Sequence, residues 1–273
     1  MECSSCGALR VRACERKACD RADQRLRFDG ENFISLALGD ASLRGIQASR
    51  ITPGREKSDR TLFAVKGGDG PTGGGYNNTF TRRGAMSEAK SGYVALFVSE
   101  AGDVQTERVN VARNLAWTHL PSNFSTIEQS ETYDVVATDT AVVNDQAQAW
   151  AVSIKDYWGG VFTGQNRGVV WLTSYTDLET EHAERPKLVR YNEDRFFVLW
   201  EKWSLTDYVE TMALVVDASG STIVEARSLG VLRLSRGDDA FLLDNQAAWL
   251  DSHDGQVFLH LVDVDLDVST DTL

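Results

Sequence analysis

Short apolar runs separated by turn residues dominate this chain of 273 residues, and they constrain its fold more than any other feature. From Phe28 onward, runs rich in Val, Ile, Phe, Trp and Thr alternate with clusters of Gly, Asp, Asn and Ser. Such runs predict β-strands, and the clusters between them predict turns. No window keeps a helical apolar period over several turns, so no helix is predicted. We therefore expect an all-β chain.

Several of the predicted strands are continuously apolar rather than alternating, which is typical of sheets buried on both faces. The predicted strands span residues 32–38, 93–100, 147–156, 167–175, 187–191, 195–203, 211–218, 222–229, 239–244, 247–252 and 256–268. A glycine-rich segment, 66–84, interrupts the series and lacks the Gly-Lys-Ser/Thr ending of a phosphate-binding loop, so we expect a surface loop there.

One stretch of the chain resembles another that follows 114 residues later, counted from Ala112 to Ala226. "ARNLAWTHL" (112–120) is similar to "ARSLGVLRL" (226–234), and the segments before them, "ALFVSEAGDV" and "ALVVDASGST", are also similar. Half of 114 is 57, and aromatic strand positions recur at steps near that size: Phe33, Tyr93, Trp150, Phe197 and Trp249. Such a step suits a four-stranded antiparallel sheet with its loops.

Repeats of this length resemble those of β-propellers, in which four-stranded sheets stack around an axis. The resemblance is architectural and covers about residues 28–268; the WD dipeptide, the kelch double glycine and a correctly spaced sialidase Asp box are absent from the sequence. It implies a propeller of about five antiparallel blades, with a pair of β-sandwiches as the alternative. The expected division is a Cys-rich N-terminal appendage, 1–25, and a propeller-like domain, 26–273.

All four cysteines lie near the N-terminus, with the spacing C-x2-C-x7-C-x4-C: Cys3, Cys6, Cys14 and Cys19. Two disulfides in a small knot are the favoured interpretation, and the spacing does not choose their pairing. A zinc site and reduced thiols are the alternatives, although seven residues between the pairs is short for a zinc ribbon.

The chain is acidic, with a formal net charge of −12. That charge argues against nucleic-acid binding, which needs clustered Lys and Arg. No run of 18 apolar residues occurs, so we expect no membrane insertion. No signal peptide is visible, and the expected disulfides are therefore what favours an extracellular or periplasmic location.

Aromatic residues beside carboxylates give the candidate ligand-binding set. "KDYWGG" places Asp156, Tyr157 and Trp158 at a predicted hairpin tip, and "WEKW" places Glu201 and Trp203 near a strand end. Exposed aromatic rings with carboxylates suit a glycan or protein ligand. The alternative is that these rings pack over neighbouring loops.

The sequence evidence for metal ligands is weaker than that for the ligand-binding set. Asp263, Asp265 and Asp267 alternate on a predicted strand, so their carboxylates would share one face at steps of about 6.6 Å. Ca²⁺ needs its oxygens within about 2.6 Å of one centre, so a solvated edge strand is the expectation. The four histidines are scattered, and neither His253 nor His260 is expected to bind metal. We expect no cofactor.

Three functions follow from these patterns. The first is a non-catalytic binding or scaffold protein that recognises a glycan or a protein through propeller loops. The second is a carbohydrate-active enzyme with paired carboxylates at the propeller axis. The third is a repeat segment of a larger assembly. Because folds host many functions, architecture alone does not choose among them.

Overall fold

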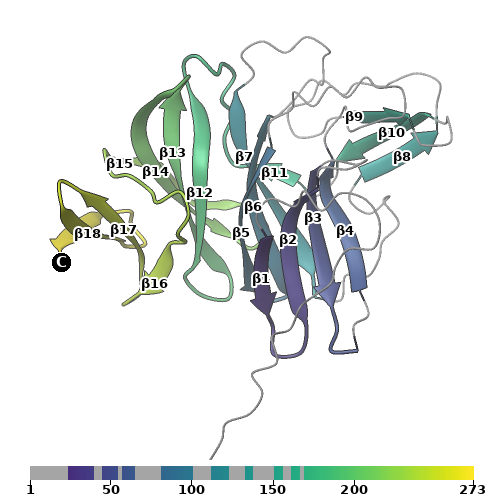
Figure 1. Cartoon of the computed structure of the whole chain (residues 1–273), viewed down its shortest axis with the longest axis horizontal. Coiled ribbons are helices and arrows are strands. Elements are labelled where there is room, and N and C mark those ends of the chain that lie inside the picture. Colours follow the sequence, from purple (N-terminus) through teal and green to yellow (C-terminus); the bar gives the residue numbers. More distant parts are fainter. Residues whose placement is uncertain are drawn as a thin grey trace, which may run out of the picture.

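The computed structural model describes residues 24–39, 45–54, 57–64, 81–100, 112–122, 133–137, 151–155, 161–166 and 169–273. Within these ranges every regular element is a β-strand, and the strands form five antiparallel sheets (Figure 1). The all-β prediction is therefore confirmed. Nothing in the described ranges forms a helix with the length and hydropathy that a membrane span requires.

Four sheets have four strands each, and we number them I to IV. Sheet I contains β1 (Gln24–Phe28), β2 (Phe33–Gly39), β3 (Gly45–Ile51) and β4 (Lys57–Ala64). Sheet II contains β5 (Thr81–Ala89), β6 (Gly92–Glu100), β7 (Arg113–Pro121) and β11 (Val169–Trp171). Sheet III contains β12 (His182–Arg190), β13 (Arg195–Ser204), β14 (Asp207–Asp217) and β15 (Thr222–Gly230). Sheet IV contains β16 (Phe241–Leu243), β17 (Gln246–His253), β18 (Gln256–Val262) and β19 (Val268–Thr272).

The remaining sheet is an insertion. Its strands are β8 (Tyr133–Ala137), β9 (Ala151–Lys155) and β10 (Val161–Asn166). The chain then returns to sheet II, where β11 pairs with β7 through Val170 and Trp117. Asn114 holds the segment after β11, because its side-chain oxygen accepts from the Tyr175 amide at 2.7 Å. Residues 122–168 thus separate the third and fourth strands of one sheet.

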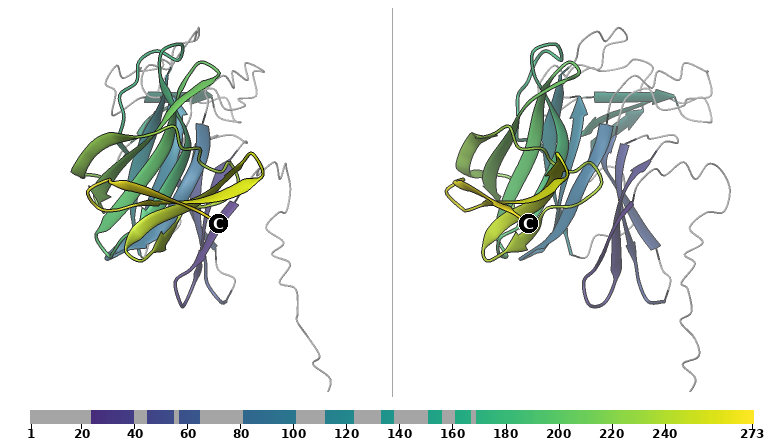
Figure 2. Two further views of the ribbon diagram at one scale, coloured as in Figure 1. Left: turned by 90° about the vertical axis from the view of Figure 1, so that its left-hand side faces the viewer. Right: turned by 60° about the vertical axis from the view of Figure 1, so that its left-hand side comes forward.

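The four-stranded sheets follow one another in a series, and their first strands contact each other. β1 contacts β5, β5 contacts β12, and β12 contacts β16. Figures 1 and 2 show sheet I at one end of the series and sheet IV at the other. A series of four-stranded antiparallel sheets is compatible with consecutive blades of a propeller. Closure of the sheets into a propeller stays a prediction.

Sheet III is buried on both faces because β13 sends alternate side chains into two cores. Phe196, Val198 and Trp200 pack against sheet II, whereas Phe197 and Leu199 pack against sheet IV. A strand of alternating side chains can be apolar throughout only when both faces are covered. The continuous apolar run at 196–200, inside the predicted strand 195–203, therefore predicted its environment correctly.

The aromatic positions that suggested the repeat mark equivalent strands. Phe33, Tyr93, Phe197 and Trp249 lie in β2, β6, β13 and β17, each the second strand of its sheet. The second strand has a neighbour on both sides, and the rings of Tyr93, Phe197 and Trp249 there are buried. Trp150 lies outside the described residues.

The longer likeness, between 112–120 and 226–234, does not join equivalent positions. Arg113 begins β7, the third strand of sheet II, whereas Arg227 lies inside β15, the fourth strand of sheet III. In each copy two consecutive strands pair antiparallel, β6 with β7 and β14 with β15, and any two such hairpins share that pattern. The likeness therefore reports hairpins and not a sheet-to-sheet correspondence.

The expectation that Asp263, Asp265 and Asp267 lie on one strand face is wrong, because they form the turn between β18 and β19. The Asp263 carboxylate accepts from the amides of Asp265 and Asp267 at 3.0 and 2.9 Å. Leu266 has a φ of 62° and is buried against the core of sheets III and IV. A side-chain cap of this kind competes with a strand ladder, which is why an alternating pattern misled.

Candidate functional site

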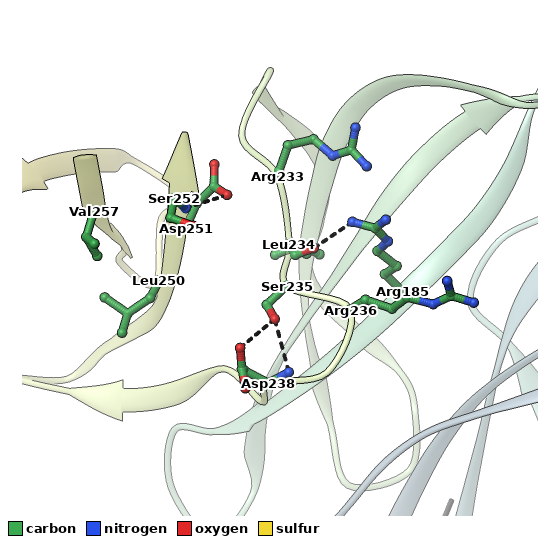
Figure 3. Close-up of a pocket in the computed structure, with 10 residues that line it drawn as sticks. All are labelled: Arg185, Arg233, Leu234, Ser235, Arg236, Asp238, Leu250, Asp251, Ser252 and Val257. Atoms are coloured by element: carbon green, nitrogen blue, oxygen red, sulfur yellow. Dashed lines mark hydrogen bonds between the residues drawn. The ribbon is translucent and has the colours of Figure 1, made fainter. Parts of the chain in front are cut away.

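The candidate site is a pocket of about 510 Å³ beside the segment that connects sheet III to sheet IV. One wall is the connecting segment itself, with Arg185 of β12 beside it, and the other wall belongs to β17 and β18 (Figure 3). The lining residues are Arg185, Arg233, Leu234, Ser235, Arg236, Asp238, Leu250, Asp251, Ser252 and Val257. The site therefore combines three guanidinium groups and two carboxylates with apolar side chains.

We call the wall that carries Arg185 and Arg233 the arginine wall. A buried carboxylate, Glu201 of β13, holds these two arginines in place. Its Oε1 accepts from Arg185 Nη1 at 3.2 Å and from Arg233 Nε at 3.1 Å. The amide of Leu234 donates to the same oxygen at 2.9 Å, and Trp203 Nε1 donates to Oε2 at 2.8 Å. Glu201 is 0% exposed, so this carboxylate is available only to these four donors. A buried charge is tolerated when it is paired and hydrogen-bonded in this way.

A β-bulge places Arg185 at the site. The register of β12 against β13 shifts between Glu184 and Lys187, and Arg185 has a φ of 51°. An extra residue in one strand re-aims the side chains around it. Arg185 Nη1 consequently also donates to the carbonyl of Leu234 at 2.9 Å, which ties β12 to the connecting segment.

An aromatic pair lies beneath the second arginine. The guanidinium carbon of Arg233 is 4.2 Å from the Tyr208 ring centroid and 5.2 Å from that of Trp203. The two rings meet edge to face, with centroids 6.0 Å apart. Burial raises the pKa of Tyr208, so its hydroxyl stays protonated and donates to the carbonyl of Leu232 at 3.1 Å. The hydrogen bond to Glu201 holds the edge of the Arg233 guanidinium, and the Tyr208 and Trp203 rings pack on its plane.

The outer part of the pocket contains exposed side chains that a ligand could contact. Ser235 donates to the Asp238 carboxylate at 2.7 Å and accepts from its amide at 3.1 Å, a local turn that Figure 3 shows. Arg236 is exposed and forms no ion pair with the described part of the chain. Leu250 and Val257 are 45% and 41% exposed. A pocket lined by an exposed cation and by uncovered apolar side chains can take a ligand that carries both an acid and an aliphatic group.

A second carboxylate near the site is also engaged. Glu184 accepts from Arg113 Nη1, which joins sheet III to β7 of sheet II. His182 Nε2 lies 3.9 Å from the same carboxylate. Burial lowers the pKa of His182, and the Arg113 charge lowers it further, while Glu184 opposes them. The imidazole is therefore neutral near pH 7, and this group is a junction between sheets.

The residues that the sequence nominated divide into two groups. Glu201 and Trp203 come together, but as an internal hydrogen bond with arginine over the indole ring. Asp156, Tyr157 and Trp158 lie outside the described residues, as do the cysteines at 3, 6, 14 and 19. The five-residue ligand set and the disulfides stay predictions. Within the described ranges, no three His, Cys, Asp or Glu side chains gather in a way that could hold a metal ion.

Sequence reasoning missed Arg185, Arg233 and Tyr208. Arg185 is aimed by a bulge that only the pairing of β12 with β13 reveals. Arg233 lies in the segment that connects sheet III to sheet IV, and the path of that segment depends on how both sheets are placed. Tyr208 carried the one readable signal, because it lies five residues after Trp203 across a short hairpin and so meets it on the facing strand.

Comparison with known proteins gives little. No protein-family profile matches the chain, and no curated protein matches it. Among solved structures, the chain is similar to the one described as "Crystal structure of TolB from Acinetobacter baumannii", with 12% sequence identity and a TM-score of 0.29. The likeness covers 89% of this chain and 52% of that one, so the chain spans about half the length of the protein it matches.

Proposed function

We propose that this chain is a non-catalytic binding module that recognises an acidic segment of a protein partner. The observation that carries the proposal is the composition of the pocket, which is lined by the exposed Arg236 as well as by the apolar Leu250 and Val257. The ligand is an extended peptide whose carboxylate pairs with Arg236 and whose aliphatic side chain covers the two apolar residues. Arginine is well suited to this contact because its guanidinium binds carboxylates through two parallel hydrogen bonds.

The hydrogen bonds of two carboxylates beside the pocket, Glu201 and Glu184, support binding over acid–base chemistry at these two residues. Glu201 and Glu184 each accept hydrogen bonds from arginine. A general acid or base has to exchange a proton with a substrate within hydrogen-bond reach. Both carboxylates instead hold strands and sheets together.

A labelled octapeptide of alternating leucine and glutamate tests the proposal by fluorescence polarisation. In an extended peptide, leucine and glutamate side chains point to opposite sides. We expect saturable binding, and we expect Arg236→Glu to weaken it at least tenfold because the charge that pairs with the peptide is reversed.

Two controls make the result specific. Arg195→Glu reverses an exposed charge at the other end of β13 from Glu201, and it should leave binding unchanged. A peptide of alternating leucine and lysine should not bind. If Arg195→Glu and Arg236→Glu weaken binding equally, the effect is one of net charge and the proposed pocket is wrong.

A further inference from the structure

One side of β17 is open over half of its length. β18 pairs with β17 as far as His253, whereas β16 pairs with it only from Gln246 to Ala248. Among the described residues, no other strand lies on the β16 side of β17, because the chain that leads into β16 bends at 236–238 instead of following β17. We call residues 249–253 on that side the open edge. An unpaired strand edge is a template for another strand.

The backbone of β17 presents hydrogen-bonding groups at the open edge. His253 and Gln256 close a hairpin across a two-residue turn, 254–255, and the closing pair of such a hairpin is hydrogen-bonded. Every second residue counted back from His253 therefore bonds to β18. The residues between them, Ser252 and Leu250, direct their amides and carbonyls to the open edge.

The two outward amides are in different states. The amide of Ser252 donates to the Asp251 carboxylate at 2.8 Å. No backbone partner in the described part of the chain faces the amide and carbonyl of Leu250, since pairing with β16 ends at Ala248. Leu250 thus keeps both groups for an added strand.

The pocket reaches both faces of sheet IV at the open edge. Leu250 and Asp251 follow one another in a strand, so their side chains point to opposite faces, yet both line the pocket. Val257 is on the same face as Leu250, because it pairs with Ser252. The apolar side chains of the pocket therefore lie on one face of the sheet.

The cations of the pocket come from the other face. Trp249 is on the face of Asp251, and its Nε1 donates to the Arg233 carbonyl at 3.0 Å. This bond places the connecting segment over that face, and Arg236 belongs to the same segment (Figure 3). A strand added at the open edge would consequently have apolar side chains on one of its faces and the connecting segment on the other.

From this we infer that the acidic peptide of the proposed function binds as an added strand of sheet IV, antiparallel to β17 and in line with β16. The inference rests on the proposed function and specifies how the peptide is held. The peptide residue opposite Leu250 exchanges two backbone hydrogen bonds with it and places its side chain beside Leu250 and Val257. The residues before and after it point to the face of Arg236. Leucine suits the first position, and glutamate suits the flanking ones.

Backbone methylation of the peptide tests the inference without changing the protein. In the octapeptide of alternating leucine and glutamate, the inferred pairing directs the leucine amides toward β17 and the glutamate amides away from it. N-methylation of all the leucines should weaken binding by about tenfold or more in fluorescence polarisation, because a methylated nitrogen cannot donate. N-methylation of all the glutamates is the matched control, with the same side chains, charge and number of methyl groups. It should change the Kd by less than about threefold, since no hydrogen bond to β17 is lost.

Hydrogen exchange followed by NMR gives a second readout, on the protein itself. Saturating peptide should slow exchange of the Leu250 amide by about tenfold or more, because the amide becomes hydrogen-bonded. The Leu242 amide is the control. It lies on the outer side of β16, since Leu243 and Phe241 are the residues that bond to β17, and its exchange should stay the same.

The outcomes separate this inference from the proposed function. If the unmethylated peptide does not bind, the proposed function fails and the inference fails with it. If that peptide binds and both methylated forms bind equally well, recognition is by side chains alone and only the inference is wrong. Loss of binding on glutamate methylation, with leucine methylation tolerated, would indicate a parallel strand and overturn the inferred register. Unchanged exchange of the Leu250 amide in the complex would place the peptide away from the open edge.

Discussion

At the scale of single residues, Glu201 decides the local structure of the site. Its carboxylate accepts from two guanidinium groups, an indole and an amide, and it is fully buried. Hydrogen bonds to a charged group contribute about 1.5–3 kcal/mol each, but Arg185 and Arg233 are partly solvated, which reduces the effect. In Glu201→Gln a side-chain amide replaces the carboxylate. The NH2 group of that amide is a hydrogen-bond donor, and it then faces one of the four groups that donate to the carboxylate in the wild type.

We expect Glu201→Gln to lower the free energy of unfolding by about 2–3 kcal/mol, measured by urea denaturation with the two-state slope unchanged. Glu225→Gln changes an exposed carboxylate of β15 in the same way and should cost less than about 0.5 kcal/mol. Equal effects in the two variants would mean that Glu201 does not organise the arginine wall.

At the scale of elements, the turn between β14 and β15 is fitted to a tryptophan of another sheet. Gly220 has a φ of 87°, and a Cβ added there would lie 2.6 Å from Trp117 Cδ1. Trp117 in turn donates to the Ala218 carbonyl at 3.2 Å. Only glycine satisfies both the backbone conformation and the space at this position.

Gly220→Ala should therefore lower the free energy of unfolding by about 3 kcal/mol, because strain of about 1 kcal/mol adds to a clash with a fully buried ring. Gly230→Ala isolates the strain: its φ is 86°, and no atom lies within 4 Å of an added Cβ. That variant should lose only about 1 kcal/mol in the same thermal or urea experiment. A similar loss in both would show that the ring moves aside.

Residue patterns in the sequence predicted those strands whose neighbours are close along the chain. The aromatic positions Phe33, Tyr93, Phe197 and Trp249 each lie in the second strand of a sheet, which has a neighbouring strand on both sides. The pairing of β11 with β7 could not be predicted, because β11 has only three residues and its partner lies across the inserted sheet.

The candidate site was predicted less well than the sheets. Glu201 and Trp203 were nominated as exposed ligands, yet the carboxylate is buried and the indole nitrogen binds it. Their environment depends on Arg185, whose direction comes from a bulge, and on Arg233, which enters from a connection between sheets. Such contacts depend on tertiary packing, which residue patterns do not encode locally.

At the scale of the whole molecule, one of the side-chain ties between sheet I and sheet II titrates. Tyr93 of β6 donates to the Asp29 carboxylate in the turn between β1 and β2. Burial raises the pKa of Asp29, but the hydrogen bonds from Tyr93 and from the amides of Asn32 and Glu31 outweigh it and lower the pKa to about 2, from 3.8. A depressed pKa means that the folded state favours the charged carboxylate. This stabilisation is complete above about pH 4 and is lost as the pH falls toward 2.

Tyr93→Phe removes that tie while keeping the ring in the core. At pH 7 we expect it to lower the free energy of unfolding by about 1 kcal/mol, since Asp29 is only partly buried and solvent screens its hydrogen bond. The difference from wild type should shrink between pH 4 and pH 2, where protonation of Asp29 weakens the bond in the wild type as well. Tyr191→Phe is the control: it removes a hydroxyl from a tyrosine that packs on Phe197, at a centroid distance of 5.7 Å, and its effect should not change with pH. A Tyr93→Phe effect that is constant from pH 7 to pH 2 would mean that the Asp29 carboxylate does not couple sheet I to the stack.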